Sequence, residues 1–409
     1  MDRAVKAFFA LMLAASALGF VKFLTLAKIM PGAAFGDYVS IVGVAMLSAS
    51  VLSFGAIEGT VKRYPRLWVA GQRAAIGSDA RSILVRVTLR FLAVAVLLAA
   101  INDVFGWSYS RLDVVIGTLF GLGTALQALM ASLLRAVDRA SALASFSLAR
   151  SSFAFVAAIT GGALAGWEGA LTGEVLACVV SLAQGRWIAL RAYRDLPAGS
   201  GEMAEQVPEN RHDGLRLYLA NTLSSVTGLG DRAFVNAALG AAAAGSYGVL
   251  AMVFQVGQLL VGILAQRIGT TFIKASYAGN TGYDAVRRIW LVFAGLLLVS
   301  GGMVGTLLLL ERLNWPASFF DKYTLSPLSI ILAGGVAAMQ IYMVIEFYLL
   351  SRDQENGVLV ASIIGAILLV GCVIIGSHNA WPLEWFVGSV FLAKAVQLLA
   401  LVVAGRRAR

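Results

Sequence analysis

Long blocks of apolar residues alternate with short charged or turn-rich segments along the whole chain. Each block holds about 20 mostly apolar residues, the length that a helix needs to cross a bilayer. Strands of a membrane barrel would instead alternate apolar and polar residues over about 10 positions. We therefore predict an all-α, polytopic membrane protein with about twelve spans, at 7–29, 38–58, 84–103, 112–133, 142–165, 169–190, 216–238, 246–266, 289–310, 326–350, 356–376 and 384–404.

The composition supports this interpretation. The chain has 409 residues, of which 59% are hydrophobic and 13% are charged. Soluble domains are nearer a quarter charged, and disordered chains are polar, so neither class fits. Twelve spans would use about 240 residues, which leaves short loops and no large soluble domain. The two cysteines and two histidines lie apart in the sequence. We therefore expect no disulfide framework, no metal site and no cofactor.

Lysine and arginine gather on one side of the predicted spans. With the N-terminus in the cytoplasm, about 24 of them face the cytoplasm, and only Lys28, Arg111, Arg312 and Lys322 face outward. This is the positive-inside pattern, and it predicts that both termini are cytoplasmic. It also accounts for the net charge of +10 without a nucleic-acid partner.

The two halves of the chain carry the same turn. Gly36 and Tyr38 recur 209 residues later as Gly245 and Tyr247. The longest predicted loop falls between the sixth and seventh spans. We expect an N-terminal six-helix lobe over 1–195, a cytoplasmic linker over 196–215 and a C-terminal six-helix lobe over 216–409. Duplicated folds of this kind place the substrate path between the halves.

Several ionisable residues lie inside the predicted spans, where each costs at least about 2.5–3.5 kcal/mol. Lys22, Glu174 and the pair Asp231–Arg232 lie toward the outer side. We expect them to form a mixed-charge layer, in which Asp231 and Glu174 are candidates for binding a coupling ion. The alternative is that Lys22 reaches outward to the interface and the others form structural pairs.

The seventh span is polar along one face. Its polar residues follow helical spacing at Asn221, Ser224, Ser225, Gly228, Asp231 and Arg232. Such a face meets either a water-filled cavity or a neighbouring helix. Gln255 and Gln258 in the eighth span are a weaker case of the same kind.

Two cations lie deeper. Arg150 and Lys394, one from each half, have no acidic residue nearby in their own helices. They are candidates for binding an anionic substrate, because arginine matches phosphate through its planar fork and lysine acts as a point charge. Arg150 is alternatively an interface anchor. We expect Glu58 and Glu346 to be solvated at helix ends, with a gate or ion-pair role as the alternative.

The candidate substrate-binding set is Lys22, Arg150, Arg232, Lys394, Asn221, Ser225, Gln255 and Gln258. The sequence lacks the phosphate-binding loop of an ATP-driven pump and the motifs of zinc and serine hydrolases. Gly-x-x-x-Gly pairs at Gly117/Gly121 and Gly301/Gly305 indicate helix packing.

The N-terminal region carries a resemblance to a known family. Leu26–Gly32 and Phe35–Tyr38 are followed by a second span ending in Phe54–Gly59 and then by Arg63 and Tyr64. This resembles bacterial polysaccharide flippases, in which a Gly-x-Tyr turn follows the first helix and Arg-Tyr follows the second. They belong to the multidrug, oligosaccharidyl-lipid and polysaccharide exporter superfamily.

The resemblance implies two six-helix lobes around a central cavity lined largely by helices one, two, seven and eight, with Lys22, Asp231 and Arg232 on its wall. It implies alternating-access transport of undecaprenyl-pyrophosphate-linked oligosaccharides from the cytoplasmic to the periplasmic leaflet of a bacterial inner membrane. The related lipid II flippases usually have fourteen spans, so twelve favour an O-antigen or exopolysaccharide unit. The expected partners are the bilayer and the lipid-linked oligosaccharide, with a polysaccharide polymerase and chain-length complex as a candidate.

Two other functions stay open. One is a cation-coupled exporter of small drugs on the same fold, which a cavity dominated by acidic and aromatic residues would favour. The other is a membrane enzyme of polysaccharide assembly. Such enzymes usually carry large outer loops or catalytic acidic motifs, whereas the outer loops here are short, so we predict that the protein is not an enzyme.

Overall fold

The computed structural model describes residues 3–69, 72–105, 110–136, 140–194, 213–277, 283–313, 319, 322–352 and 354–407. Within these residues the secondary structure is helical. The chain divides into two compact units, unit 1 (Met1–Ile29 and Ile41–Tyr218) and unit 2 (Met30–Ser40 and Leu219–Arg409). The expected linker over 196–215 lies outside the described residues except for its last three positions.

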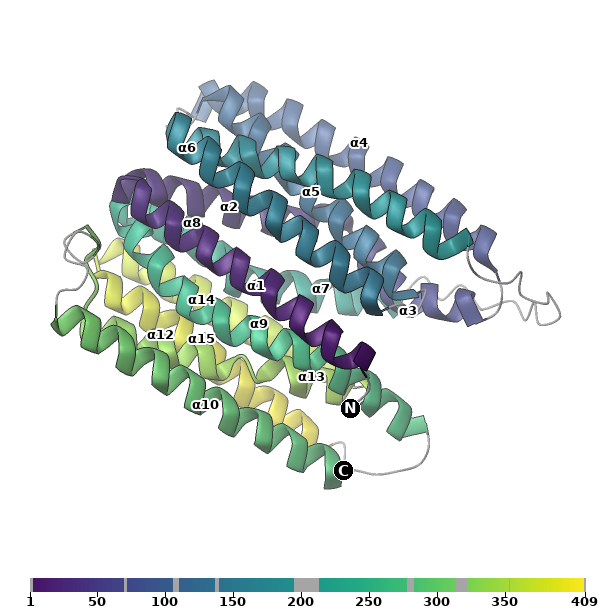
Figure 1. Cartoon of the computed structure of the whole chain (residues 1–409). Coiled ribbons are helices and arrows are strands. Elements are labelled where there is room, and N and C mark those ends of the chain that lie inside the picture. The colour runs from purple at the N-terminus through teal and green to yellow at the C-terminus, as the bar shows by residue number, and fades with distance from the viewer. Residues whose placement is uncertain are drawn as a thin grey trace. The chain divides into compact units, whose positions relative to one another are not determined.

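Unit 1 is built on long helices that pack side by side. Its elements are α1 (Arg3–Ile29), the second part of α2 (Gly32–Ser53), α3 (Ala56–Val69), α4 (Arg73–Phe105), α5 (Arg111–Ala136), α6 (Ala140–Arg194) and the start of α7 (Asp213–Ser225). α5 packs between α4 and α6, and α1 lies along α6 (Figure 1).

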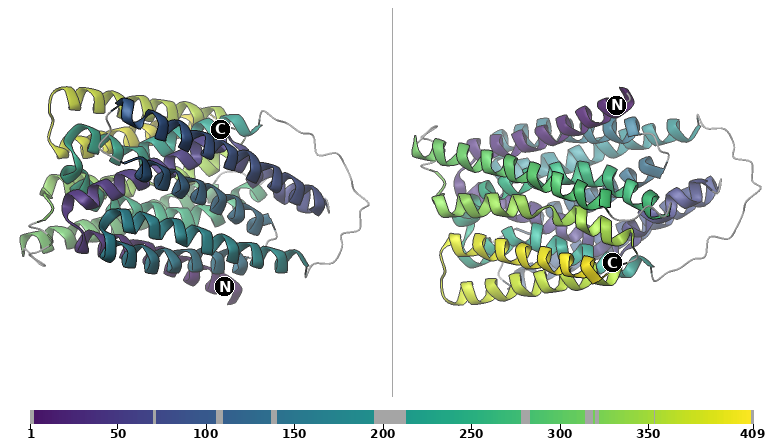
Figure 2. Two further views of the ribbon diagram at one scale, coloured as in Figure 1. Left: turned by 90° about the horizontal axis from the view of Figure 1, so that it is seen from above. Right: turned by 90° about the horizontal axis from the view of Figure 1, so that it is seen from below.

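Unit 2 contains the first residues of α2 and the rest of the chain. Its further elements are the end of α7, the π-helix η1 (Val226–Gly230), α8 (Asp231–Leu239), α9 (Ala241–Tyr277), α10 (Tyr283–Arg312), α12 (Pro327–Met339), α13 (Tyr342–Leu350), α14 (Glu355–His378) and α15 (Leu383–Arg407). α14 and α15 form a hairpin, and α12 packs on α9, α10 and α15. Figure 2 shows these helices from two further directions.

The number of spans agrees with the prediction. Ten helices of the described chain are long and apolar enough to cross a membrane. One of them covers Ser141–Arg191 and bends back at Ala165 and Gly166, whose backbone is not helical, so it supplies the fifth and sixth spans. The seventh span is the run α7–η1–α8, in which each piece is short. The all-α, polytopic fold class is thus confirmed.

Two predicted spans are interrupted. The second was expected to run to residue 58, but α2 ends at Ser53 and α3 begins at Ala56. Phe54 and Gly55 between them both have positive φ, 47° and 74°, which a helix cannot accommodate. The tenth span is broken between α12, which ends at Met339, and α13, which begins at Tyr342. Apolar composition does not reveal the second break, because both α12 and α13 are strongly apolar.

Glycines allow the closest helix contacts in unit 1. The two halves of α6 touch at Gly161 and Gly169, where a Cβ on either residue would collide with the backbone carbonyl of the other. A Cβ at Gly121 would lie 2.8 Å from the carbonyl oxygen of Ala45, so α5 meets α2 there. The Gly117/Gly121 pair therefore works as the pattern predicts. The pair Gly301/Gly305 does not, since a Cβ at either residue would meet nothing within 4 Å.

The repeated turn of the two halves forms a contact within unit 2. A Cβ at Gly36 of α2 would collide with the carbonyl of Ala241, and a Cβ at Gly245 of α9 would collide with that of Gly32. Adding 209 to 32 and 36 gives 241 and 245, so each half supplies the same pair of positions to the contact. Residues 30–40 therefore group with unit 2, although the sequence places them in the N-terminal lobe.

Candidate functional site

Unit 2 encloses a polar cavity of about 120 Å³. Its lining includes Asn221, Ser224 and Ser225 from α7, Thr227 and Gly228 from η1, Asp231 and Arg232 from α8, Phe254, Gln255 and Gln258 from α9, Tyr342 and Glu346 from α13, and Lys394 from α15. Gln340, between α12 and α13, completes the polar lining. Amide, hydroxyl and charged groups thus meet inside a membrane domain.

The polar face of the seventh span opens onto this cavity. All six residues of the predicted stripe line it. Ser224 also contacts Ser362 of α14 and Gln397 of α15, so this face meets both the cavity and neighbouring helices. Gln255 and Gln258 line it as well. The π-helix lies in the middle of the stripe, at Val226–Gly230. Single π-helical turns are rare inside α-helices and are frequent at functional sites. The part of these residues in binding stays a prediction.

Lys394 enters the cavity wall from α15 with its ammonium group held on several sides. Nζ donates to Thr227 Oγ1 at 2.7 Å and to Gln397 Oε1 at 3.4 Å, and it lies 4.4 Å from the ring centre of Tyr342. The side chain is only 1% exposed. A cation–π contact of this kind favours a desolvated ammonium. The position of Lys394 is therefore set by η1 and α13.

Asp231 and Arg232 are adjacent at the start of α8 and differ in their hydrogen bonding. The Asp231 carboxylate accepts hydrogen bonds from the Tyr247 hydroxyl at 2.5 Å and from the Arg232 backbone N–H at 2.9 Å. The Arg232 side chain is buried, and its Nε has no hydrogen-bond partner among the described residues. Buried donors are normally satisfied, so an unpartnered one calls for an explanation.

The cavity holds equal numbers of acidic and basic side chains, but these do not form direct ion pairs. It holds two acids, Asp231 and Glu346, and two bases, Arg232 and Lys394. Within the described part of the chain, neither cation forms an ion pair with either carboxylate. Lys394 nevertheless lies within electrostatic range of both acids. No group of three or more His, Cys, Asp or Glu residues in the described ranges could hold a metal ion.

Four polar lining residues fall outside both the predicted stripe and the predicted binding set. The expectation of a solvated helix end for Glu346 was wrong, since this residue lines the cavity together with Tyr342. The break between α12 and α13 lies just before this pair. Gln340 and Thr227 are the other two. A signal was present at Gln340, because an amide in the middle of an otherwise apolar span rarely faces lipid.

The remaining predicted residues cluster in unit 1. Lys22 of α1 is buried and forms an ion pair with Glu174 of α6. Arg150, also on α6, is exposed and lies within electrostatic range of Glu174. Lys22 does not reach outward to the interface as one alternative proposed, because its side chain is engaged by a buried carboxylate. The three together carry one net positive charge.

Comparison with solved structures identifies the architecture. A MATE family transporter of the MOP superfamily in an inward-facing conformation is 14% identical, with a TM-score of 0.63, over 100% of this chain and 98% of that protein. The lipid II flippase MurJ in an inward closed conformation is 14% identical, with a TM-score of 0.66, over 98% and 87%. The MATE transporter VcmN of Vibrio cholerae, in its bent form, is 13% identical, with a TM-score of 0.62, over 99% and 97%.

The chain has the fold of MOP superfamily transporters. No family model matches the sequence, and no curated protein sequence matches it either. Identities of 13% to 14% over nearly the whole length show a common fold and leave the substrate open. The three proteins compared are two transporters and a flippase. The chain accordingly shares its overall fold with these proteins, and ten helices of its described part are long and apolar enough to cross a membrane.

Proposed function

We propose that this protein is a flippase that carries an anionic, lipid-linked saccharide from the cytoplasmic to the periplasmic leaflet of a bacterial inner membrane. The observation that supports it best is the buried Arg232 guanidinium on the wall of the unit 2 cavity, with a donor that no described protein group occupies. A phosphate or pyrophosphate oxygen would satisfy that donor, since guanidinium and phosphate match in geometry and charge.

The uncharged lining of the cavity suits a saccharide. Four amides and three serine or threonine hydroxyls line it, namely Asn221, Gln255, Gln258 and Gln340 with Ser224, Ser225 and Thr227. Amides can donate and accept at once, and hydroxyls can turn to do either. These are the groups that sugar hydroxyls need. This favours an O-antigen or exopolysaccharide unit over an apolar drug.

The volume of the cavity supports a transport cycle by alternating access. About 120 Å³ holds roughly four water molecules at about 30 Å³ each. A saccharide unit needs a larger space, so the substrate would enter only in a more open conformation. The π-helix beside the cavity is a suitable place for that change, because single π-helical turns are frequent at functional sites.

A drug exporter remains the second candidate, and one observation favours it. Asp231 and Glu346 line the cavity with the aromatic rings of Phe254 and Tyr342, a combination that would bind an organic cation. Against this, Arg232 and Lys394 offset both acids. An organic cation would therefore meet no net negative charge in this cavity.

The test is complementation in a bacterial strain that lacks its own O-antigen flippase. Arg232→Gln removes both the positive charge and the paired N–H donors of the guanidinium group. Arg232→Lys keeps the positive charge but removes those paired donors. Because a hydrogen bond to a charged group contributes about 1.5–3 kcal/mol, polymer synthesis should fall by about 10-fold to 100-fold in both variants. Arg288→Gln, an exposed arginine at the start of α10, is the matched control and should retain synthesis.

The same strains separate the two candidates. If the protein exports drugs, Asp231→Asn and Glu346→Gln will abolish resistance to cationic dyes while both Arg232 variants retain it. The double variant Arg232→Gln/Lys394→Met tests the flippase proposal directly. A normal amount of polymer from this variant, at normal abundance of the protein in the membrane, would contradict the proposal.

Ion coupling forms a separate part of the proposal. Asp231 and Glu174 are the buried acids that we propose for it, one in each unit. Asp231→Asn and Glu174→Gln are compared for transport per folded molecule while the sodium concentration and the pH are varied. Unchanged transport and unchanged ion dependence in both variants would remove these residues from any coupling role.

A further inference from the structure

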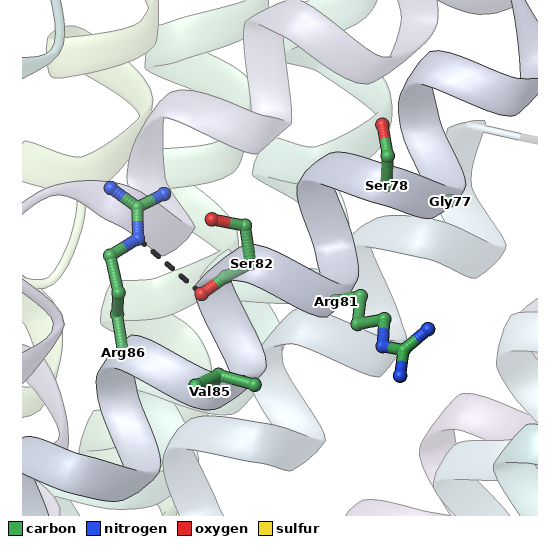
Figure 3. A pocket seen from close by; sticks show the side chains of 6 residues that line it. All are labelled: Gly77, Ser78, Arg81, Ser82, Val85 and Arg86. Carbon is green, nitrogen blue, oxygen red and sulfur yellow. Dashed lines mark hydrogen bonds between the residues drawn. The ribbon is translucent and has the colours of Figure 1, made fainter.

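A shallow hollow lies along α4 in unit 1, close to the start of that helix (Figure 3). Its lining is Gly77, Ser78, Arg81, Ser82, Val85 and Arg86, and its volume is about 590 Å³. Residues four apart lie above one another on a helix. The lining therefore consists of two neighbouring rows, Gly77–Arg81–Val85 and Ser78–Ser82–Arg86.

Two exposed guanidinium groups give the hollow its charge. Within the part of the chain that the structure describes, neither Arg81 nor Arg86 has an acidic partner. Arg86 Nε donates only to the carbonyl of Ser82 in its own helix, at 3.4 Å. The acid nearest in sequence, Asp79, forms an ion pair with Arg63 at 3.0 Å. Two positive charges therefore remain uncompensated.

An exposed apolar stripe continues from the hollow along α4. Val85, Leu89, Leu92 and Val96 follow helical spacing, and all are exposed, up to 71% at Val96. From Val85 to Val96 the helix rises by about 16 Å at about 1.5 Å per residue. This equals about half the thickness of the hydrocarbon core, the depth of one leaflet. The positively charged hollow thus adjoins the N-terminal end of the apolar stripe, and the stripe is about as long as one acyl chain.

We propose that this surface binds an anionic phospholipid of the bilayer. Arg81 and Arg86 lie at opposite edges of the hollow, with their guanidinium groups pointing apart (Figure 3). Both would turn inward to contact the lipid phosphate, the hydroxyls of Ser78 and Ser82 would bond the rest of the headgroup, and one acyl chain would lie along the stripe. Clusters of basic residues at the membrane edge attract anionic lipids, and arginine binds phosphate through paired hydrogen bonds. Under the predicted topology this is the cytoplasmic leaflet.

Gly77 supplies a way to close the hollow without changing its charge. A Cβ at this position would meet no protein atom within 4 Å. Gly77→Leu should therefore leave the packing of α4 intact, and leucine also favours helix over glycine. Its side chain would fill space that the headgroup needs.

The experiment measures lipid binding to the purified full-length protein in detergent, by native mass spectrometry with phosphatidylglycerol or phosphatidylcholine. Wild type should bind phosphatidylglycerol saturably and in preference to phosphatidylcholine. Removing both charges in Arg81→Gln/Arg86→Gln should weaken phosphatidylglycerol binding about 25-fold, at about 1 kcal/mol per basic residue and 1.4 kcal/mol per tenfold.

Two further variants make the test specific. Arg287→Gln/Arg288→Gln removes two exposed charges at the start of α10 and should leave the saturable binding unchanged. Gly77→Leu should abolish that binding with every charge retained. Thermal unfolding in the same detergent shows that each variant is folded.

Three results would overturn the proposal. Equal losses in the two arginine pairs would mean that lipid follows overall charge. Unchanged binding in Gly77→Leu would mean that the hollow is not occupied. Complete competition by soluble glycerol 3-phosphate would identify a site for free phosphate compounds in place of a lipid.

Discussion

The buried ion pair between Lys22 and Glu174 leads to a prediction about stability with an unequal outcome for its two members. Both side chains are almost fully buried, and Arg150 lies within electrostatic range of the same carboxylate. Removing Glu174 leaves two cations without this carboxylate. Removing Lys22 leaves the carboxylate with one cation still in range. We therefore expect Glu174→Gln to destabilise the protein more than Lys22→Met does.

The magnitude follows from the burial of the pair. Breaking a buried ion pair by removing one partner costs about 3–5 kcal/mol, because the other charge stays in a poorly solvated place. Glu174→Gln should fall in that range, and Lys22→Met should fall below it. The double variant Lys22→Met/Glu174→Leu should recover much of the loss, because no uncompensated charge remains between the two helices.

The assay is equilibrium unfolding of purified protein in mixed micelles with increasing sodium dodecyl sulfate, followed by circular dichroism. Arg63→Gln is the control, because Arg63 forms a more exposed pair with Asp79, with its side chain 45% exposed. Such a pair contributes at most about 1 kcal/mol. A Lys22→Met variant as unstable as Glu174→Gln, or more so, would refute the role given to Arg150.

Two other stability predictions can be checked by thermal unfolding in detergent. Gly161→Val should cost at least about 1–3 kcal/mol, because its side chain would collide with the Gly169 backbone across the α6 hairpin, whereas Gly301→Val should be nearly neutral. Equal effects at the two glycines would contradict the packing. Tyr247→Phe should cost about 1.5–3 kcal/mol, because it removes a hydrogen bond to the buried Asp231 carboxylate. A neutral result would mean that this bond adds nothing to stability.

The two units carry their buried charge in different ways, which bears on the choice of variants. In unit 1 the acid and a base meet directly, so substitutions there act first on stability. In unit 2 the four charged groups of the cavity do not pair, and Arg232 retains an unpartnered donor. Substitutions in the cavity are therefore the better probes of transport.

Much of the fold could be read from local sequence. Membrane insertion depends on the composition of about 20 consecutive residues, so the apolar blocks predicted the twelve spans. Helical periodicity also placed the polar residues of the seventh span on one face, and these residues do line a cavity. Both are properties of a single helix, which is why they needed no knowledge of its neighbours.

Only the tertiary structure decided which groups meet. Lys394 contacts Thr227 across 167 positions of sequence, and Lys22 contacts Glu174 across 152. Periodicity names the face that a residue occupies, whereas its partner depends on which helix packs there and at what height. Breaks inside a span change that register, as between α12 and α13, just before Glu346. Composition stays the same across such breaks, so the sequence determined the spans and the packing of the helices determined the site.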